Sequence, residues 1–261
     1  MGELVRLEIE GRVAIVMIDN PPMNVLSRQV TRELDEIFTS LAEDHSVGAV
    51  ILTGNGNRAF MAGADIKEFP QNMGASKEEK LAKNKGTHQV LNKIANLPKP
   101  TIAMLNGLAL GGGCELSLTC DIRIAEEHVK VGLPEVKLGL FPGGGGTQRL
   151  PRLVGPSKAK ELMFVGEPLT AAQAYEIGLV NKVVPSGEGL ETAKAMAAKM
   201  ASYSAEALAY IKQAVNEGYD QPVEEGLNLE AQLFAEVFET DNVKEGVRAF
   251  LEKRQPVFNQ K

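Results

Sequence analysis

The sequence has few cysteines and histidines, the residues that form disulfides and bind metals, and it has no long apolar run that could span a membrane. It contains two cysteines, Cys114 and Cys120, and three histidines, and these form no spaced cluster, so no metal site is expected. No apolar run approaches the length of a membrane span. The opening residues MGELVRLEIE are not a basic and apolar leader. We therefore expect a cytoplasmic protein with two free thiols.

Basic residues are fewer than acidic ones, with 28 Lys and Arg against 34 Asp and Glu. The formal net charge is −6, which disfavours nonspecific binding to nucleic acid or to acidic membranes, so neither is expected as a partner. The 261 residues are 44% hydrophobic. Such a chain can build one large core, or a core with a small appendage.

Apolar runs and helical spacings alternate along the first 190 residues. Runs typical of strands occupy 4–9, 12–18, 48–54, 101–105, 121–127 and 129–132, and helical patterns cover 30–41, 88–97, 112–120 and 156–166. Pro98 and Pro100 end one helical pattern before a strand begins. Repeated β-β-α units of this kind predict an α/β fold.

The chain changes character near residue 191 and becomes alanine-rich and helical. Two apolar stripes follow at helical spacing, one from Val223 to Phe238 and one from Val243 to Leu251. We expect residues 1–190 to form the catalytic core and 191–261 to form a helical region. The sequence leaves open whether this region covers its own core or a neighbouring subunit.

Three consecutive glycines, 111–113, stand between a predicted strand and a predicted helix that contains Glu115. Backbone N–H groups at a helix start are free to bind negative charge. The glycines could instead allow close packing of helix on strand. A second segment, Ala62-Gly63-Ala64-Asp65, also follows a strand and offers another N–H, although Asp65 could equally be a helix cap.

A third segment joins Glu135 to four glycines, 143–146. No lysine follows these glycines, and neither glycine run completes G-x-G-x-x-G, so nucleotide binding is disfavoured. Glu115 and Glu135 remain as a pair beside glycine-rich turns. Two buried carboxyls that share a site have raised and separated pKa values, as an acid and a base require.

Other charged groups have simpler interpretations. The lysine-rich segment 76–86 is predicted to be solvated and mobile, as a lid would be. Lys253 and Arg254 could contact a phosphate, although solvated surface charge is the more common role of such residues.

With these three segments in hand, the sequence resembles the crotonase superfamily, and specifically enoyl-CoA hydratases, over essentially its whole length. The resemblance is carried by FMAGADIKEF, NGLALGGGCELSLTCDIRIA and PEVKLGLFPGGGGTQRLPRLVG, in that order. It implies a spiral of ββα units with a C-terminal trimerisation region, and hence a homotrimer or a dimer of trimers. Many relatives have alanine at Gly144, a departure expected to alter the acyl pocket while leaving the assignment of the catalytic pair unchanged.

The resemblance also implies roles for individual residues. The oxyanion-hole donors would be the N–H groups of Ala64 and Gly112, and the catalytic carboxyls would be Glu115 and Glu135. The implied substrate and CoA contacts are Ala62, beside the adenine, Lys253, donated to a phosphate by a neighbouring subunit, and Asp65, Ile66 and Gly143.

The implied reaction is hydration of a trans-2-enoyl-CoA to a 3-hydroxyacyl-CoA, without a cofactor other than the CoA of the substrate. The alternatives on the same fold are an enoyl-CoA isomerase with one base, and a specialised acyl-CoA hydratase-lyase. A noncatalytic, RNA-associated homologue is disfavoured because both glutamates are present and the chain is acidic.

Overall fold

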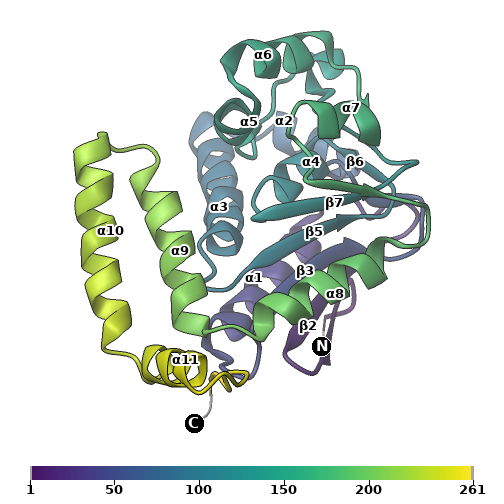
Figure 1. Cartoon of the computed structure of the whole chain (residues 1–261). Coiled ribbons are helices and arrows are strands. Elements are labelled where there is room, and N and C mark those ends of the chain that lie inside the picture. Colours follow the sequence, from purple (N-terminus) through teal and green to yellow (C-terminus); the bar gives the residue numbers. More distant parts are fainter. Residues whose placement is uncertain (1, 260–261) are drawn as a thin grey trace.

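The computed structural model describes residues 2–259 and contains two β-sheets surrounded by helices (Figure 1). One sheet has six strands in the order β1-β2-β3-β5-β7-β10, and the other has four in the order β4-β6-β8-β9. Successive strand pairs, β3 with β4, β5 with β6 and β7 with β8, place one strand in each sheet. This arrangement confirms the predicted α/β fold of repeated ββα units.

The larger sheet begins with a hairpin and continues as parallel strands. Strands β1 (Val5–Glu10) and β2 (Val13–Ile18) pair antiparallel across a turn at Gly11, whose φ is +58°. The strands that follow in parallel are β3 (Ala49–Gly54), β5 (Thr101–Leu105), β7 (Ile122–Glu126) and β10 (Lys182–Val184). All but β10 were expected from apolar runs at these positions.

Alternate residues of β2 face two separate cores, as the two-residue period of a strand requires. Val13 and Ile15 belong to a core that includes alanines of helix α8 (Gly189–Ala201). Val16 on the opposite face packs in a core with residues of α1 (Arg28–Glu43) and α3 (Lys77–Ala95). Covering both faces explains why the parallel strands are continuous apolar runs.

The strands of the smaller sheet are short, and most are absent from the sequence predictions. They are β4 (Ala59–Ala62), β6 (Leu108–Leu110), β8 (Lys130–Gly132) and β9 (Leu169–Thr170). Only β8 was predicted. Two to four residues are too few to display a period, so neighbouring strands rather than local pattern determine these pairings.

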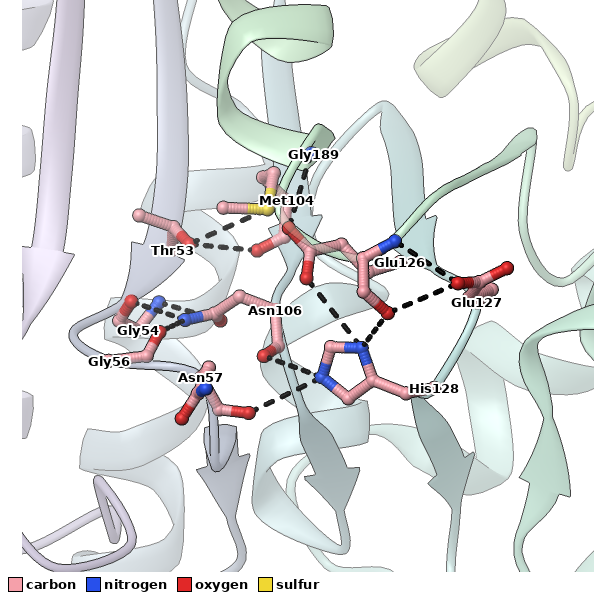
Figure 2. Close-up of polar contacts among 11 residues, drawn as sticks. Thr53, Gly54, Gly56, Asn57, Met104, Asn106, Glu126, Glu127, His128 and Gly189 are labelled. Atoms are coloured by element: carbon pink, nitrogen blue, oxygen red, sulfur yellow. Dashed lines mark hydrogen bonds and ion pairs between the residues drawn. The ribbon is translucent and has the colours of Figure 1, made fainter.

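Figure 2 shows how the starts of β4 and β6 are held beside each other. The Asn106 side-chain amide donates to the carbonyl oxygens of Gly54 and Gly56, at 2.6 Å each. Nε2 of His128 lies 3.3 Å from the carbonyl oxygens of both Asn57 and Asn106. Because β4 and β6 begin two residues after Asn57 and Asn106, these contacts fix the two strands at the ends opposite to their glycine-rich loops.

The segment 76–86 is exposed, as predicted, and it is largely helical, because Ser76 and Glu79 form a capping box that starts α3 at Lys77. One local prediction needs correction. Helix α4 spans Gly112–Ser117 and stops before Cys120. The hydroxyls of Ser117 and Thr119 donate to carbonyl oxygens three residues earlier, and such local bonds compete with continued helix.

Helices α5 (Gly146–Val154), α6 (Pro156–Val165) and α7 (Ala171–Glu176) lie over the smaller sheet, and α2 (Phe69–Met73) precedes α3. Helices α9 (Ala205–Gly218), α10 (Val223–Phe238) and α11 (Asp241–Leu251) form an arm beside the body (Figure 1). The predicted boundary at residue 191 falls inside α8, which packs on the larger sheet. Among residues 2–259, no helix combines the length and apolar character needed to cross a membrane.

Candidate active site

The backbone at Ala64 is arranged so that its N–H points away from its neighbouring chain segment. Leu26 and Ala64 form a parallel bridge, in which the Leu26 N–H donates to Gly63 O at 2.9 Å and the Asp65 N–H donates to Leu26 O at 3.0 Å. These two bonds use the peptide groups on either side of Ala64. The Ala64 N–H therefore faces the opposite direction, and Gly63, with φ +95°, permits the turn.

Gly112 presents a second N–H at the start of α4, after Gly111 turns the chain with φ +54°. A Cβ added to Gly112 would lie 3.6 Å from the Ala64 nitrogen, so the two backbone segments are neighbours. Within residues 2–259, neither the Ala64 N–H nor the Gly112 N–H has a backbone acceptor. The structure thus brings together the two predicted donors.

Gly113, the next residue, allows close packing of α4 on β4 and is not one of the two predicted donors. A Cβ at Gly113 would lie 1.9 Å from the carbonyl oxygen of Met61, in β4. Only glycine allows the backbone of α4 to approach β4 so closely. The two interpretations of the glycine run, anion binding and close packing, therefore apply to different glycines of the same run.

Glu115 is buried, with 5% of its surface exposed, and its carboxylate is held by backbone N–H groups. The Gly144 and Gly146 N–H groups donate to Oε1 at 2.6 and 2.8 Å. Burial raises the pKa of the Glu115 carboxyl, and these two hydrogen bonds partly offset that rise. This contact between Gly144 and Glu115 was not predicted from the sequence.

Glu135 has a different environment. It begins a short 3-10 helix (Glu135–Leu138) after β8, and its Oε2 is a buried atom without a hydrogen-bond partner in the part of the chain that the structure describes. Burial, followed by the negative charge of Glu115, raises the pKa of Glu135 to about 7. The position of a Cβ on Gly111 lies 3.2 Å from Glu135 Oε1, which places this carboxyl beside the start of α4.

The two carboxyls are therefore close and chemically unequal. Hydrogen bonds from Gly144 and Gly146 favour the ionised form of Glu115, whereas burial raises the pKa of Glu135 to about 7, so a large share of this carboxyl is protonated at neutral pH. Such a pair can remove a proton at one position and deliver one at another. Both lie next to two free N–H groups, which can stabilise negative charge on an oxygen atom.

Among the other predicted contacts, Ala62, Asp65 and Ile66 lie around the Ala64 turn, whereas Lys253 lies on the arm of α9–α11. The Asp65 side chain accepts from the Lys67 N–H at 3.0 Å, which confirms the helix-cap interpretation. Ala62 is half-buried, and Ile66 is 65% exposed in the first turn after that cap. Lys253 is exposed just beyond α11. Its neighbour Arg254 forms ion pairs within the chain, with Glu245 and Glu252.

Neither cysteine has the character of a nucleophile. Both thiols are free and buried, and burial raises the pKa of Cys114 strongly and that of Cys120 to about 12. Among residues 2–259 no three His, Cys, Asp or Glu side chains are grouped to hold a metal ion. A pocket of about 500 Å³ lies beside the His128 network of Figure 2, but none of the predicted site residues lines it.

Sequence reasoning missed a polar layer behind Glu115. Asn84 and His88 of α3 contact the Gly143 carbonyl oxygen, Asn92 of the same helix accepts from Arg149, and Arg149 of α5 donates to the Gly144 carbonyl oxygen. The spacing of four residues between the three α3 side chains is the sequence signal that could have grouped them.

Comparison with known proteins agrees with this geometry. The family model described as enoyl-CoA hydratase/isomerase matches residues 8–261. A short-chain-enoyl-CoA hydratase of Clostridium acetobutylicum is 44% identical over 95% of each chain, and a crotonyl-CoA hydratase of Syntrophomonas wolfei is 42% identical over 98% of each. The crystal structure of an enoyl-CoA hydratase from Bacillus anthracis superposes with a TM-score of 0.94, at 39% identity, over 99% of this chain and 100% of that one. The chain belongs to the enoyl-CoA hydratase/isomerase family.

Proposed function

We propose that this protein is an enoyl-CoA hydratase, which adds water reversibly and with syn geometry to a trans-2-enoyl-CoA, in the manner of fatty-acid β-oxidation. The observation that carries the proposal is an unequal carboxyl pair beside two N–H groups that have no backbone acceptor within residues 2–259. Glu115 is held by two donors, and Glu135 has a buried oxygen without a partner in the same residues. Relatives named as short-chain and crotonyl-CoA hydratases support the same reaction.

The two backbone donors would bind the thioester carbonyl oxygen. Conjugation with the thioester makes C3 of the substrate electrophilic, and attack by water at C3 moves negative charge onto that oxygen. The Ala64 and Gly112 N–H groups would stabilise the resulting enolate, and the loss of one such donor typically raises a barrier by about 3 kcal/mol.

The carboxyls would then divide the proton transfers. Glu115, held ionised by two N–H groups, orients the water and removes its proton as the oxygen bonds to C3. Glu135, with a pKa raised to about 7, delivers its proton to C2. Dehydration uses the same groups in reverse. An isomerase needs one base to move a proton between carbons, so the retention of two unequal carboxyls favours hydration.

The proposal is tested by following the loss of crotonyl-CoA absorbance at the conjugated thioester band, with identification of 3-hydroxybutyryl-CoA by mass spectrometry. Conversion to the hydroxy product supports a hydratase. Binding of the thioester without hydroxy product would contradict it, and turnover of a 3-enoyl-CoA alone would identify an isomerase instead.

The proposed function also needs residues that bind the CoA and acyl parts of the substrate. We assign CoA and acyl binding to Ala62, Asp65, Ile66, Gly143 and, from a neighbouring subunit, Lys253. Four of them belong to segments that adjoin the oxyanion donors or Glu115. A cytoplasmic location is proposed on the two free buried thiols, which suit a reducing compartment.

The pH dependence of hydration should have two limbs. Activity requires ionised Glu115 and protonated Glu135. Since the pKa of Glu135 is about 7, kcat/KM should fall as the pH rises above neutrality, when this acid loses its proton. It should fall again at low pH, when Glu115 becomes protonated; because burial raises the pKa of Glu115, this limb should lie above the ordinary carboxyl range. Initial rates with crotonyl-CoA between pH 4 and 10 would check this, and an activity that stays constant from pH 6 to 9 would contradict the assignment of Glu135.

We further propose that residues 191–261 serve oligomerisation and active-site closure, and that three copies associate through the α9–α11 arm. Large apolar side chains of this arm are exposed in the single chain: Ile211, Val215, Tyr219, Val223, Leu227, Phe234, Phe238, Val247, Phe250 and Leu251. An exposed apolar surface on this scale is typical of an interface.

Light scattering should accordingly find three or six copies of the wild-type chain in each particle. Phe250, which is 83% exposed, is the most exposed of these side chains. Phe250→Asp should shift the distribution toward single chains, because a carboxylate in a closed apolar interface is unpaired. Ile9→Asp, a change at an exposed apolar position of β1, is the control. A monomeric wild type at micromolar concentration would refute this proposal.

A further inference from the structure

The glycine loop 143–146 is held from the side opposite Glu115 by one face of α3. His88 Nε2 lies 2.6 Å from the Gly143 carbonyl oxygen, and Asn84 Nδ2 donates to the same oxygen at 2.9 Å. One turn further along the helix, Asn92 Oδ1 accepts from Arg149 Nη2 at 2.6 Å. Since a carbonyl oxygen only accepts, Nε2 of His88 carries the hydrogen in this contact.

The carbonyl that His88 and Asn84 bind belongs to the same peptide unit as the N–H that binds Glu115. The peptide group between Gly143 and Gly144 is planar and trans, so its C=O and N–H point in opposite directions. Its C=O is fixed by α3, and its N–H donates to Glu115 Oε1 at 2.6 Å. Glycine on both sides of this peptide gives the unit unusual rotational freedom, so its direction depends on these bonds.

We propose that His88, assisted by Asn84, is a positioning residue for hydration: it orients the Gly143–Gly144 peptide so that its N–H holds Glu115 in place as the base. The proposal rests on the proposed function. Neither side chain needs to touch the substrate. His88 acts through one peptide group, and bonding at the carbonyl also strengthens the N–H of the same peptide as a donor.

Several groups around Glu115 favour its ionised form, which is the form that a base requires. Burial raises the pKa of Glu115, whereas the Gly146 and Gly144 N–H groups and then the charges of His88 from α3 and Arg149 from α5 lower it. Glu135 from the 3-10 helix and the Cys114 thiol are further titratable neighbours, and the thiol is kept neutral because burial raises its pKa. If the Gly144 N–H turns away, the pKa of Glu115 should rise further.

The test compares His88→Leu, which removes the donor, with His88→Gln, whose side-chain amide can donate to Gly143 O. With crotonyl-CoA, His88→Leu should lower kcat by about tenfold to a hundredfold, as the loss of groups that orient a reacting residue commonly does. KM should change much less than kcat, because Gly143 is the only assigned substrate contact that adjoins this peptide. The acid limb of the pH profile should move to higher pH. His88→Gln should recover most of kcat.

Two further variants separate this role from general damage to α3. Asn84→Leu removes the second donor and should have the same signature with a smaller loss, since His88 remains. Gln89→Ala, an exposed neighbour on the same helix, should match the wild type. A His88→Leu enzyme with kcat within twofold of the wild type, or with an unmoved acid limb, would overturn the proposal, and so would a loss confined to KM.

If the proposed function is wrong, the wild type itself will form no hydroxyacyl product. This result differs from failure of the positioning role, in which the wild type is active and His88→Leu is equally active. If the wild type forms no product, the titration of Glu115 can be followed by NMR with ¹³C-labelled glutamate side chains, assigned by comparison with Glu115→Gln. A higher Glu115 pKa in His88→Leu than in the wild type, recovered in part by His88→Gln, would support the positioning role. An unchanged pKa would refute it.

Discussion

Glu135→Gln is expected to lower kcat for crotonyl-CoA hydration by about a hundredfold to ten-thousandfold, the range that general acid catalysis supplies. The amide has nearly the shape of the carboxyl group but cannot deliver a proton to C2. The present geometry leaves Glu135 Oε2 buried without a protein partner, so the substitution breaks no internal hydrogen bond of that atom. Binding of the acyl-CoA should persist, and KM should change little.

Glu115→Gln should cause a loss of similar size for a different reason. Its amide oxygen can still accept from the Gly144 and Gly146 N–H groups, so the loop stays in place. The variant cannot remove a proton from water. Steady-state rates with both single variants and the double variant would measure this, and the double variant should lose less than the product of the two single losses, because the carboxyls act as a unit.

Stability measurements separate lost chemistry from lost folding in these variants. The pKa of Glu135 rises from its ordinary value of 4.5 to about 7 in the folded protein. A carboxyl with a raised folded-state pKa contributes stability below pH 4.5 that is lost as the pH rises through about 7. Glu135→Gln should therefore be at least as stable as the wild type at pH 8. An inactive variant that also unfolds more easily at pH 8 would contradict the assignment, as would full activity.

Gly113→Ala is expected to have the largest effect on stability. The added Cβ would lie 1.9 Å from the Met61 carbonyl oxygen and 2.7 Å from its carbonyl carbon. Both are backbone atoms of β4, so no side-chain rotation relieves the overlap, and α4 must move away from the strand. Overpacking of this kind costs about 3 kcal/mol or more in the free energy of unfolding. Hydration should fall as well, since the same movement separates the Gly112 and Ala64 donors.

Gly112→Ala is the matched control one residue earlier. Its Cβ would have its nearest contacts at 3.5 Å, to Leu26, and 3.6 Å, to Ala64, which are ordinary van der Waals distances. Its free energy of unfolding should stay within about 1 kcal/mol of the wild type, the size of a glycine-to-alanine change in a helix. Thermal unfolding at equal protein concentration would compare the two variants. Equal unfolding midpoints would show that α4 and β4 do not pack as described.

Much of this architecture could be predicted from local pattern. The apolar runs that became β2, β3, β5 and β7 are five or six residues long and buried on both faces, so composition alone marks them. The short strands β4 and β6 carry no such signal. Their place is decided by contacts such as those of Asn106 and His128 with the loops in front of them.

In the candidate site, too, some features follow from local sequence and others only from tertiary contacts. Local sequence was enough to show which residues could do the chemistry: glycines that free a backbone N–H, and two glutamates in apolar surroundings. It could not determine that two loop N–H groups hold Glu115 while Glu135 Oε2 has no partner among residues 2–259, nor that His88 reaches the glycine loop from 55 residues away. Chemical capacity belongs to a residue and its immediate neighbours along the chain. Proton affinity depends on burial and on charges and donors from distant segments, which only the folded structure brings together.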